Sequence, residues 1–401
     1  MIIIMKLKKK EVIYILSNVG RIGELVAQMW RLRNIFTEDK YKLTVICDPI
    51  DKNPRTNKTV FNVVMRGVNV IFSNNSNLLS LHGIDRYYPE PVYNSERIYA
   101  LLHQTNIGNL FAQKNYLKKT KFYFSLTDLE IKRGDHIRKK FGIPKNSPIV
   151  TLHVREPGYL SEHTWAEGPR ISNSKIENII PSIAFLISQG FYVVRIGDKS
   201  MKRIVNMPPQ LIDAPFHHAY SDIVEPYFIS QSKFYITCSS GPSALAWGFG
   251  TPLLIVNGIL DSRITDPENT LMIFKKVYSS QLRRNLTYEE ILQSPFSDYS
   301  EDSVFLSKAK VEIIDNSAEE ILLSVKEMCL RLEGKYNEDE LIDQRIRKIQ
   351  EKVHFFRRKL APLVFDYSPC LRSLYSYAKI SHEFIKDNPD FLGHEWPVIE
   401  S

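Results

Sequence analysis

The chain has few cysteines and no long hydrophobic run. Its four cysteines, Cys47, Cys238, Cys329 and Cys370, lie far apart and form no CxxC pair. This spacing excludes a disulfide-rich scaffold and predicts free thiols in a reducing compartment. No window of the sequence approaches the ~20 apolar residues that a membrane-spanning helix needs. We therefore expect a protein that does not cross a bilayer.

The chain also lacks the motifs of several binding functions. His163, His217 and His218 form no HExxH or other metal spacing, and no DxD follows a predicted strand, so we expect no resident metal. No RNP-like aromatic motif is interleaved with basic residues, which argues against a nucleic-acid partner. The first ten residues place apolar residues before a lysine cluster, the reverse of a secretory signal. These absences together predict a cytoplasmic protein.

Its length and composition are those of a globular protein. Of the 401 residues, 43% are hydrophobic and 24% are charged, and this length predicts two to three domains. Residues 1–147 hold 25 lysine and arginine residues against 12 aspartate and glutamate residues, a net charge of +13, whereas residues 148–401 carry a net charge of −5. A basic first half favours an anionic partner, such as a phospholipid surface. A general richness in lysine is the alternative.

Short β-branched runs alternate with helical patterns along the first part of the chain. The expected strands are residues 12–16, 43–47 and 68–72. Between the first two, Leu25, Met29 and Leu32 recur at the spacing of a helix. Strands that alternate with helices predict a parallel sheet that helices cover on both faces.

A second series of the same kind follows Gly142 and Pro144, which end a predicted helix. Its expected strands are residues 149–154, 191–196, 233–237 and 252–256, and its expected helices are residues 176–189 and 244–249. The chain is therefore expected to be α/β, with two Rossmann-like, doubly wound domains that face a cleft. We place these domains at residues 1–147 and 148–330.

Residues 331–401 are expected to form a helical C-terminal extension. Helical patterns cover residues 318–332 and 338–360, and the tail beyond them is rich in aromatic residues. We expect this extension to pack back on the first domain.

The strongest local signal is the turn from Ser239 to Ser243, after the predicted strand 233–237. Ser239, Ser240, Gly241 and Ser243 are small, and Pro242 suits the start of a helix. Backbone N–H groups at such a start are open to an anion, and the serines add hydroxyl donors. An ordinary helix start without a ligand is the alternative.

Two further candidates follow strands of the same domain. His153 and Arg155 end its first strand, where ligands of open α/β sheets bind, and an arginine suits bidentate contact with a pyrophosphate. An ion pair between Arg155 and Glu156 is the alternative. Arg195 and Asp198 end the next strand, where Asp198 would orient a ribose or substrate hydroxyl, or else cap the following helix.

The first domain contributes a glycine loop. Gly20, Arg21 and Gly23 follow the first strand, without the full GxGxxG spacing of a dinucleotide site. Glu24 comes next, at the start of the predicted helix and on the side of the expected cleft. Its carboxylate is a candidate general base for an incoming hydroxyl, and a favourable charge for the helix dipole is the alternative.

Together these segments resemble a bacterial family of GT-B-type glycosyltransferases from surface-polysaccharide (O-antigen or capsule) loci. The resemblance covers most of the chain and runs through residues 151–158, Arg170, residues 194–198, residues 239–243, the glycine loop and the tail Ile380 to Phe391. It implies a GT-B-like fold, with an acceptor-side first domain and a donor-binding second domain.

Two other families are similar in smaller patches. His153-x-Arg155 resembles the HxR element of fucosyltransferases, whose arginine holds the donor pyrophosphate, and Ser240-Gly241-Pro242 is similar to the donor-phosphate loop of heptosyltransferases. A Gly-Asp pair supplies the catalytic acid residue of heptosyltransferases, and Gly23-Glu24 matches it. The polysaccharide family has a histidine at that place. The match to the heptosyltransferase pair implies Glu24 as the catalytic base, and His153 is the next candidate.

The expected function is a metal-independent glycosyltransferase that moves a sugar from a nucleotide-sugar donor to a glycan or lipid-linked acceptor. Arg155, Arg195, Asp198 and the turn Ser239–Ser243 would bind the donor. No cofactor is expected, because the nucleotide sugar is a co-substrate. The expected location is the cytoplasm, with peripheral contact at the anionic inner face of the membrane. A nucleotide-sugar 2-epimerase-like isomerase and a non-catalytic nucleotide-sugar-binding protein are the alternatives.

Overall fold

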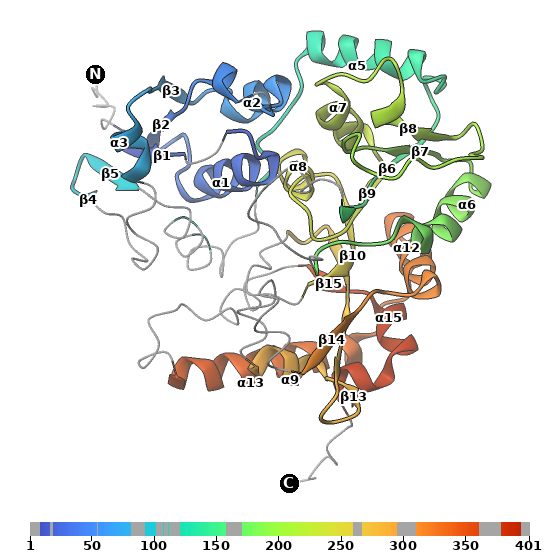
Figure 1. Cartoon of the computed structure of the whole chain (residues 1–401). Helices are drawn as coiled ribbons and strands as arrows, with labels where there is room; N and C mark the ends of the chain where they lie inside the picture. The colour runs from blue at the N-terminus through green and yellow to red at the C-terminus, as the bar shows by residue number, and fades with distance from the viewer. Residues whose placement is uncertain are drawn as a thin grey trace, which may run out of the picture.

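The computed structural model of the chain contains two α/β units and a group of C-terminal elements (Figure 1). It describes residues 9–16, 19–53, 55–81, 93–101, 107, 111, 121–157, 171–259, 267–294, 310–360 and 378–393. Each unit is built on a mainly parallel sheet with helices against it. The predicted α/β class, with two doubly wound units and C-terminal helices, is confirmed.

The first unit contains a five-stranded sheet in the order β3-β2-β1-β5-β4. Strands β1, β2, β3 and β5 are parallel, and only the short edge strand β4 is antiparallel to its neighbour. Its elements are β1 (Lys10–Ile15), α1 (Ile22–Ile35), β2 (Tyr41–Cys47), η1 (Ile50–Lys52), α2 (Lys58–Met65), β3 (Asn69–Phe72), α3 (Ser76–Ser80), β4 (Tyr93–Asn94) and β5 (Ile98–Leu101). The strand β1 is central in this order, and its residues Val12 and Tyr14 are fully buried.

The second unit contains a seven-stranded parallel sheet in the order β15-β11-β10-β9-β6-β7-β8. Every residue of β6, β9, β10 and β11 is buried, as expected of parallel strands covered on both faces. Its elements up to β11 are α5 (Asp128–Lys140), β6 (Ile149–His153), η4 (Ile176–Ile179), α6 (Ile180–Ser188), β7 (Tyr192–Arg195), β8 (Leu211–Asp213), η5 (Ala214–Phe216), α7 (Val224–Gln231), β9 (Phe234–Thr237), α8 (Ser243–Phe249), β10 (Leu253–Gly258) and β11 (Thr270–Phe274).

Helix α5 belongs by contact to this second unit, although the sequence sets the boundary after residue 147. Gly134 of α5 packs against the ring of Tyr227 in α7, where a Cβ would lie 1.9 Å from a ring carbon. Thr127 begins the helix with a capping box: its hydroxyl accepts the N–H of Glu130, whose carboxylate accepts the N–H of Thr127. The second unit therefore begins with α5.

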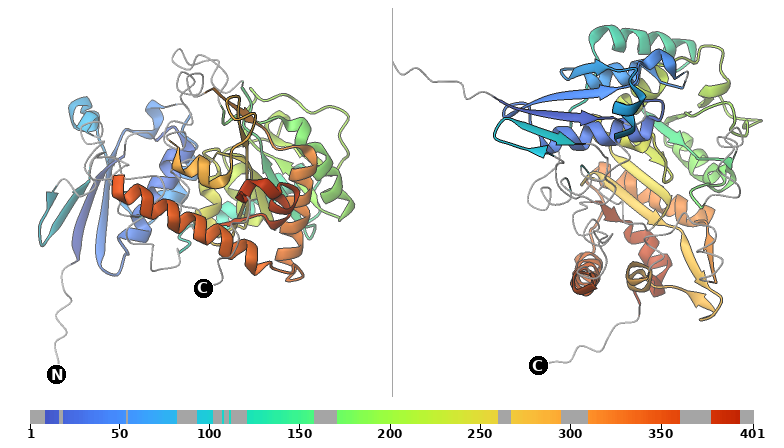
Figure 2. Two further views of the ribbon diagram at one scale, coloured as in Figure 1. Left: turned by 90° about the horizontal axis from the view of Figure 1, so that it is seen from below. Right: turned by 60° about the vertical axis from the view of Figure 1, so that its left-hand side comes forward.

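The described C-terminal elements pack on the second unit, which differs from the expected return to the first domain. Strand β15 pairs with β11, α15 packs on α12, and α13 packs on α9 (Figure 2). The apolar stripe of α13, with Ile346, Ile349 and Val353, is buried there. The elements that follow β11 along the chain are β12 (Lys276–Ser279), β13 (Arg284–Asn285), α9 (Tyr288–Gln293), β14 (Val311–Ile314), α12 (Ala318–Leu332), α13 (Glu340–Leu360), β15 (Lys379–Ile380), α15 (His382–Asp387) and η7 (Pro389–Leu392).

The cysteines and the lengths of the apolar helices can be compared with the sequence-based expectations. Cys47, Cys238 and Cys329 are free thiols, as predicted, and Cys370 lies outside the described residues. Among the helices of these residues, none combines the length and the apolar character needed to cross a membrane.

Candidate functional site

Each sheet has a switch point, where the strand order reverses direction. In the first unit it lies between β1 and β5, and in the second between β6 and β9. Ligands of open parallel sheets bind outside the carboxyl ends of the strands at such points. The glycine loop follows β1, Arg155 follows β6, and the Ser239–Ser243 turn follows β9. The predicted site segments of both units therefore lie at switch points.

The two units touch through two glycines of these segments. A Cβ on Gly23 would lie 2.3 Å from the Cα of Gly241, and a Cβ on Gly241 would lie 2.9 Å from the Cα of Gly23. Neither position has room for a side chain, so the backbones pack directly on each other. The predicted glycine loop and the predicted phosphate turn, more than two hundred residues apart in the sequence, thus meet at one place.

Aromatic packing holds the helices behind these glycines together. Trp30 of α1 is fully buried, and its ring centroid lies 5.3 Å from that of Trp247 in α8. The backbone N–H groups of Tyr123 and Phe124 both donate to the carbonyl of Gly248, at 3.0 and 2.9 Å. The approach of α1 to α8, which is visible in Figure 1, is therefore a packed contact.

The backbone of Arg155 is fixed from two sides. Its N–H donates to the Sγ of Cys238 at 3.1 Å, and its carbonyl accepts the N–H of Ser174 at 2.8 Å. His153 and Thr237 are register partners on the adjacent strands β6 and β9. Arg155 and the turn after β9 thus lie side by side, as predicted. The sequence identified Cys238 only as a buried thiol and missed its role as an acceptor for Arg155.

His153 is buried beside this arginine and is held in its neutral form. Only 9% of the residue is exposed, and its Nδ1 has no hydrogen-bond partner among the described residues. The pKa of His153 is lowered to about 4, chiefly because the ring is buried; Asp198 opposes this shift, and the positive charges of Arg195 and Arg155 contribute to it. A histidine with so low a pKa accepts a hydrogen bond readily but is a weak proton acceptor at neutral pH.

The hydroxyls of the Ser239–Ser243 turn are partly used within the protein. Ser239 Oγ accepts the N–H of Ile259 at 3.0 Å, and Ser243 Oγ donates to the carbonyl of Ser240 at 2.6 Å. The turn's own backbone offers more: among the described residues, the N–H groups of Ser240 and Gly241 have no acceptor. An anion at this turn would therefore meet backbone donors before hydroxyl donors.

Arg195 does not face the cleft, which corrects its prediction as a donor-binding residue. Its side chain is fully buried and pairs with Glu156, and its Nη1 lies 3.3 Å from Asp213. Glu156, which the sequence offers as an ion-pair partner for Arg155, pairs with Arg195 in the structure. Asp198 Oδ1 accepts the N–H of Ser200 at 2.7 Å, which stabilises the turn after β7.

Glu24 lies in the first turn of α1, directly after the Gly23–Gly241 contact. Its carboxylate pairs with the guanidinium of Arg21, the residue before the helix, and its side chain is 27% exposed. A partly exposed carboxylate beside the meeting point of the units has the access that a proton acceptor needs. Arg170, which the sequence resemblance includes, lies outside the described residues.

The sequence missed a set of polar contacts that join α2 to the start of α7. Thr59 Oγ1 donates to Asp222 Oδ2 at 2.6 Å, and Asn57 Nδ2 donates to Glu225 Oε2 at 3.2 Å. Arg133 of α5 also pairs with Asp222, at 3.0 Å. No local pattern marks Asn57 or Thr59, because each one gains its partner only when the units meet.

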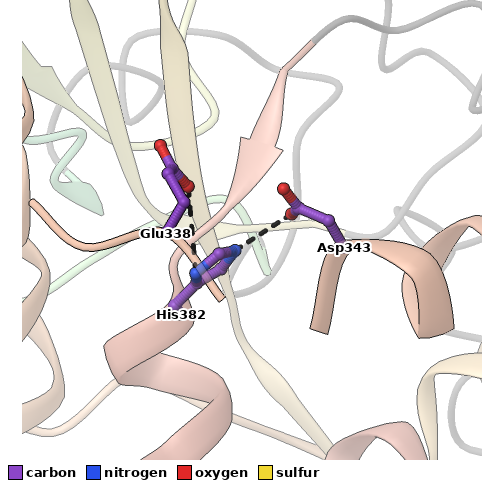
Figure 3. Close-up of side chains that lie close together, drawn as sticks. All are labelled: Glu338, Asp343 and His382. Atoms are coloured by element: carbon purple, nitrogen blue, oxygen red, sulfur yellow. Dashed lines mark hydrogen bonds and ion pairs between the residues drawn. The ribbon is translucent and has the colours of Figure 1, made fainter. Parts of the chain in front are cut away.

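Glu338, Asp343 and His382 form a cluster at the start of α13 (Figure 3). One potential ligand atom from each lies within 4.8 Å of the others. His382 Nδ1 accepts the N–H of Asp339 at 3.2 Å, so Nε2 carries the hydrogen and donates to Asp343 Oδ1 at 2.9 Å. Lys379 Nζ lies 3.1 Å from Glu338 and 3.5 Å from Asp343. Because Lys379 supplies the positive charge, the cluster is an ionic network that fixes the C-terminal residues.

The site therefore belongs to a protein of two Rossmann-like units that hold their switch-point loops against each other. The sequence matches no protein-family model and no curated protein. Among solved structures, the chain is similar to a glycosyl transferase of family 9 from Veillonella parvula, with 10% identity, 67% of this chain and 87% of that chain covered, and a TM-score of 0.41.

Two heptosyltransferases of E. coli are similar as well. ADP-heptose LPS heptosyltransferase II is 12% identical to this chain, and the alignment covers 66% of this chain and 90% of that enzyme, with a TM-score of 0.38. Heptosyltransferase WaaC with ADP-2-deoxy-2-fluoro heptose is also 12% identical, and the alignment covers 66% of this chain and 93% of that enzyme, with a TM-score of 0.33. These similarities are distant, so the function proposed below depends on the geometry of the site.

Gly23→Ala is expected to weaken the contact between the units. The new methyl group would lie 2.3 Å from a backbone atom of Gly241, and overpacking of this kind costs ~1–3 kcal/mol. The midpoint of thermal unfolding should fall. Gly20→Ala is the matched control from the same loop, because its methyl group would meet only the flexible side chain of Asn53. Equal losses in the two variants would contradict this role of Gly23.

Proposed function

We propose that the chain is a GT-B-type glycosyltransferase, which moves a sugar from a nucleotide-sugar donor to a glycan or lipid-linked acceptor. The observation that carries the proposal is the contact of the two switch-point loops at Gly23 and Gly241. A donor bound at the second unit's switch point would have its sugar next to residues of the first unit. The resemblance of the sequence to GT-B families supports the same assignment, with the first unit on the acceptor side and the second unit on the donor side.

In this proposal Arg155 and the turn at Ser240 and Gly241 bind the donor diphosphate. The arginine offers a planar fork for two phosphate oxygens, worth ~1.5–3 kcal/mol for a hydrogen bond to a charged group. The turn offers backbone N–H groups that need no side-chain ordering. The leaving diphosphate gains charge during transfer, so both groups would stabilise the transition state more than the bound donor.

The acceptor hydroxyl oxygen attacks the anomeric carbon, and the bond from that carbon to the diphosphate oxygen breaks. The hydroxyl proton passes to a base, for which we propose Glu24, and the nucleoside diphosphate leaves. Glu24 is supported by its exposure and by its place beside Gly23. His153, with its pKa lowered to about 4, fits a hydrogen-bond acceptor for the donor better than a base.

The test is an assay of NDP-sugar consumption with and without glycan acceptors. Acceptor-dependent transfer supports the proposal. Interconversion of the sugar without an acceptor would instead identify a 2-epimerase-like isomerase, and binding without turnover would identify a nucleotide-sugar-binding protein.

Arg155→Lys should weaken binding of the free nucleoside diphosphate by about tenfold or more, because a point charge cannot replace the fork. The measurement is calorimetric titration with ADP, UDP and GDP. Arg203→Lys, at an exposed arginine of the same unit, is the control and should bind as the parent does. Unchanged affinity in Arg155→Lys would place the diphosphate elsewhere.

Glu24→Gln should lower turnover by roughly 10²–10⁴-fold, since the amide keeps the shape but cannot accept a proton. The affinity for the nucleoside diphosphate should change little, because Glu24 belongs to the acceptor side. Steady-state kinetics and calorimetry on the same preparation separate the two effects. Near-normal turnover would remove Glu24 from the mechanism.

We further propose peripheral contact of the basic first part of the chain with anionic membrane lipid. Its net charge of +13 includes the exposed Lys132, Lys139 and Lys140 on α5. Binding to vesicles that contain an anionic phospholipid should weaken steeply with salt, because screening shortens to ~8 Å at physiological ionic strength. A co-sedimentation assay measures this. Binding that is absent or independent of salt would contradict the proposal.

A further inference from the structure

One contact between the two units continues through buried polar groups toward His153. Asn57 is the N-cap of α2, and its Oδ1 accepts the N–H of Val60 at 2.9 Å. Its amide Nδ2 donates to Oε2 of Glu225, in the first turn of α7, at 3.2 Å. Glu225 is only 5% exposed. A buried carboxyl of the second unit thus receives a hydrogen bond from the first unit.

Tyr220 extends this connection to the turn after β7. Its hydroxyl is hydrogen-bonded to the other carboxyl oxygen of Glu225, Oε1, and lies 2.8 Å from the carbonyl oxygen of Gly197. Gly197 has a φ of +138°, and a Cβ on it would lie 3.4 Å from Cδ2 of His153. The hydrogen-bonded chain therefore runs from Asn57 to the turn directly beside His153.

The number of hydrogen atoms along this series of hydrogen bonds shows which protonation state of Glu225 satisfies every group in it. The Tyr220 hydroxyl has one hydrogen and two oxygen neighbours, the carbonyl of Gly197 and the carboxyl of Glu225. If Glu225 is a carboxylate, the Tyr220 hydroxyl donates its hydrogen to it. The hydroxyl oxygen of Tyr220 and the carbonyl oxygen of Gly197 then face each other with no hydrogen between them. A carboxylic acid at Glu225 donates to Tyr220, and Tyr220 then donates to Gly197. Only the acid form gives every pair a hydrogen.

We infer that Glu225, as a carboxylic acid, is a positioning residue that transmits the contact between the two units to the turn beside His153. When Asn57 is in place, Glu225 stays buried and Tyr220 holds the carbonyl of Gly197. When that contact is lost or Glu225 ionises, Tyr220 turns its hydrogen to the carboxylate and the turn is released. The inference concerns the coupling of the two units and holds whether or not the chain transfers sugars.

The surroundings of Glu225 favour its neutral form. The pKa of Glu225 is raised to about 7, chiefly because the carboxyl is buried; the hydrogen bonds from Tyr220 and from the residue's own N–H oppose this rise, and the charge of Asp222 contributes to it. The titratable and charged groups around this chain are Asp222 and Tyr220 before α7, Asp198 after β7, Tyr235 of β9, Lys58 of α2 and Arg133 of α5. Lys58 forms its ion pair with Asp51, and Arg133 forms its ion pair with Asp222, so the partners of both cations are carboxylates other than Glu225.

The sign of the pH dependence follows from this raised pKa. The unfolded chain loses the Glu225 proton near 4.5 and the folded chain near 7. Between these values the folded state binds more protons, so this residue's contribution to stability is complete below 4.5 and is lost as the pH rises through 7.

Amide hydrogen exchange of the full chain tests the inference at the turn itself. The N–H groups of Ser200 and Met201 are hydrogen-bonded to Asp198 within the turn and report its opening. Their protection factors, corrected for intrinsic exchange, should fall by about tenfold as the pH rises from 5.5 to 8, which corresponds to the loss of one hydrogen bond. Residues 234–237 of β9 should stay protected and serve as the internal reference.

Glu225→Gln is the decisive variant, because its amide donates to Tyr220 and its carbonyl accepts from Asn57 as the acid does. It should keep the turn protected at every pH, whereas Tyr220→Phe should leave the turn open at every pH. A pH dependence in Glu225→Gln equal to that of the parent, or full protection in Tyr220→Phe, overturns the inference.

A second pair of variants tests the coupling between the units. Asn57→Ser keeps a cap for α2 but cannot reach Glu225, so it should open the turn by about tenfold. Thr59→Val removes the neighbouring hydrogen bond to Asp222 and should leave the turn as it is. Equal effects of the two variants contradict the transmission. Neither experiment uses a nucleotide or a sugar, so its outcome is independent of the proposed transfer.

Discussion

The direct contact between the backbones of Gly23 and Gly241 is the constraint on which the arrangement of the two units depends. Because no side chain separates these residues, the switch-point loops approach to the limit of backbone packing. Trp30 and Trp247 fill the space behind them with apolar surface, which makes the approach of α1 to α8 stable. A ligand at either switch point therefore lies at the border of both units, and residues of both can act on it.

The two arginines at neighbouring strand ends differ in burial: Arg195 is fully buried, whereas Arg155 is half-buried. Arg195 is fully enclosed with Glu156 and Asp213, a network in which removal of one partner would leave an uncompensated buried charge. Cys238 and Ser174 fix the backbone of Arg155 beside the turn.

The described C-terminal elements extend the second unit. Strand β15 extends the parallel sheet next to β11, and Glu327 of α12, which is buried, accepts hydrogen bonds from Ser381 and from the backbone of His382 and Glu383. The His382 network with Asp343 and Lys379 holds the same segment to α13. A hydrogen bond from His382 is the main cause of the lowered pKa of Asp343.

The sequence by itself determined the α/β class, the main strands of both units and helix α12, because each depends on a local pattern of apolar residues or on a cap. It also placed Arg155 and the turn at Gly241 at strand ends, since parallel strands bring their carboxyl ends to one edge. Only the tertiary structure decided that Gly23 meets Gly241, that Arg195 turns inward and that Asn57 bonds to Glu225. These contacts join residues far apart in the chain, and no local pattern carries the identity of a distant partner.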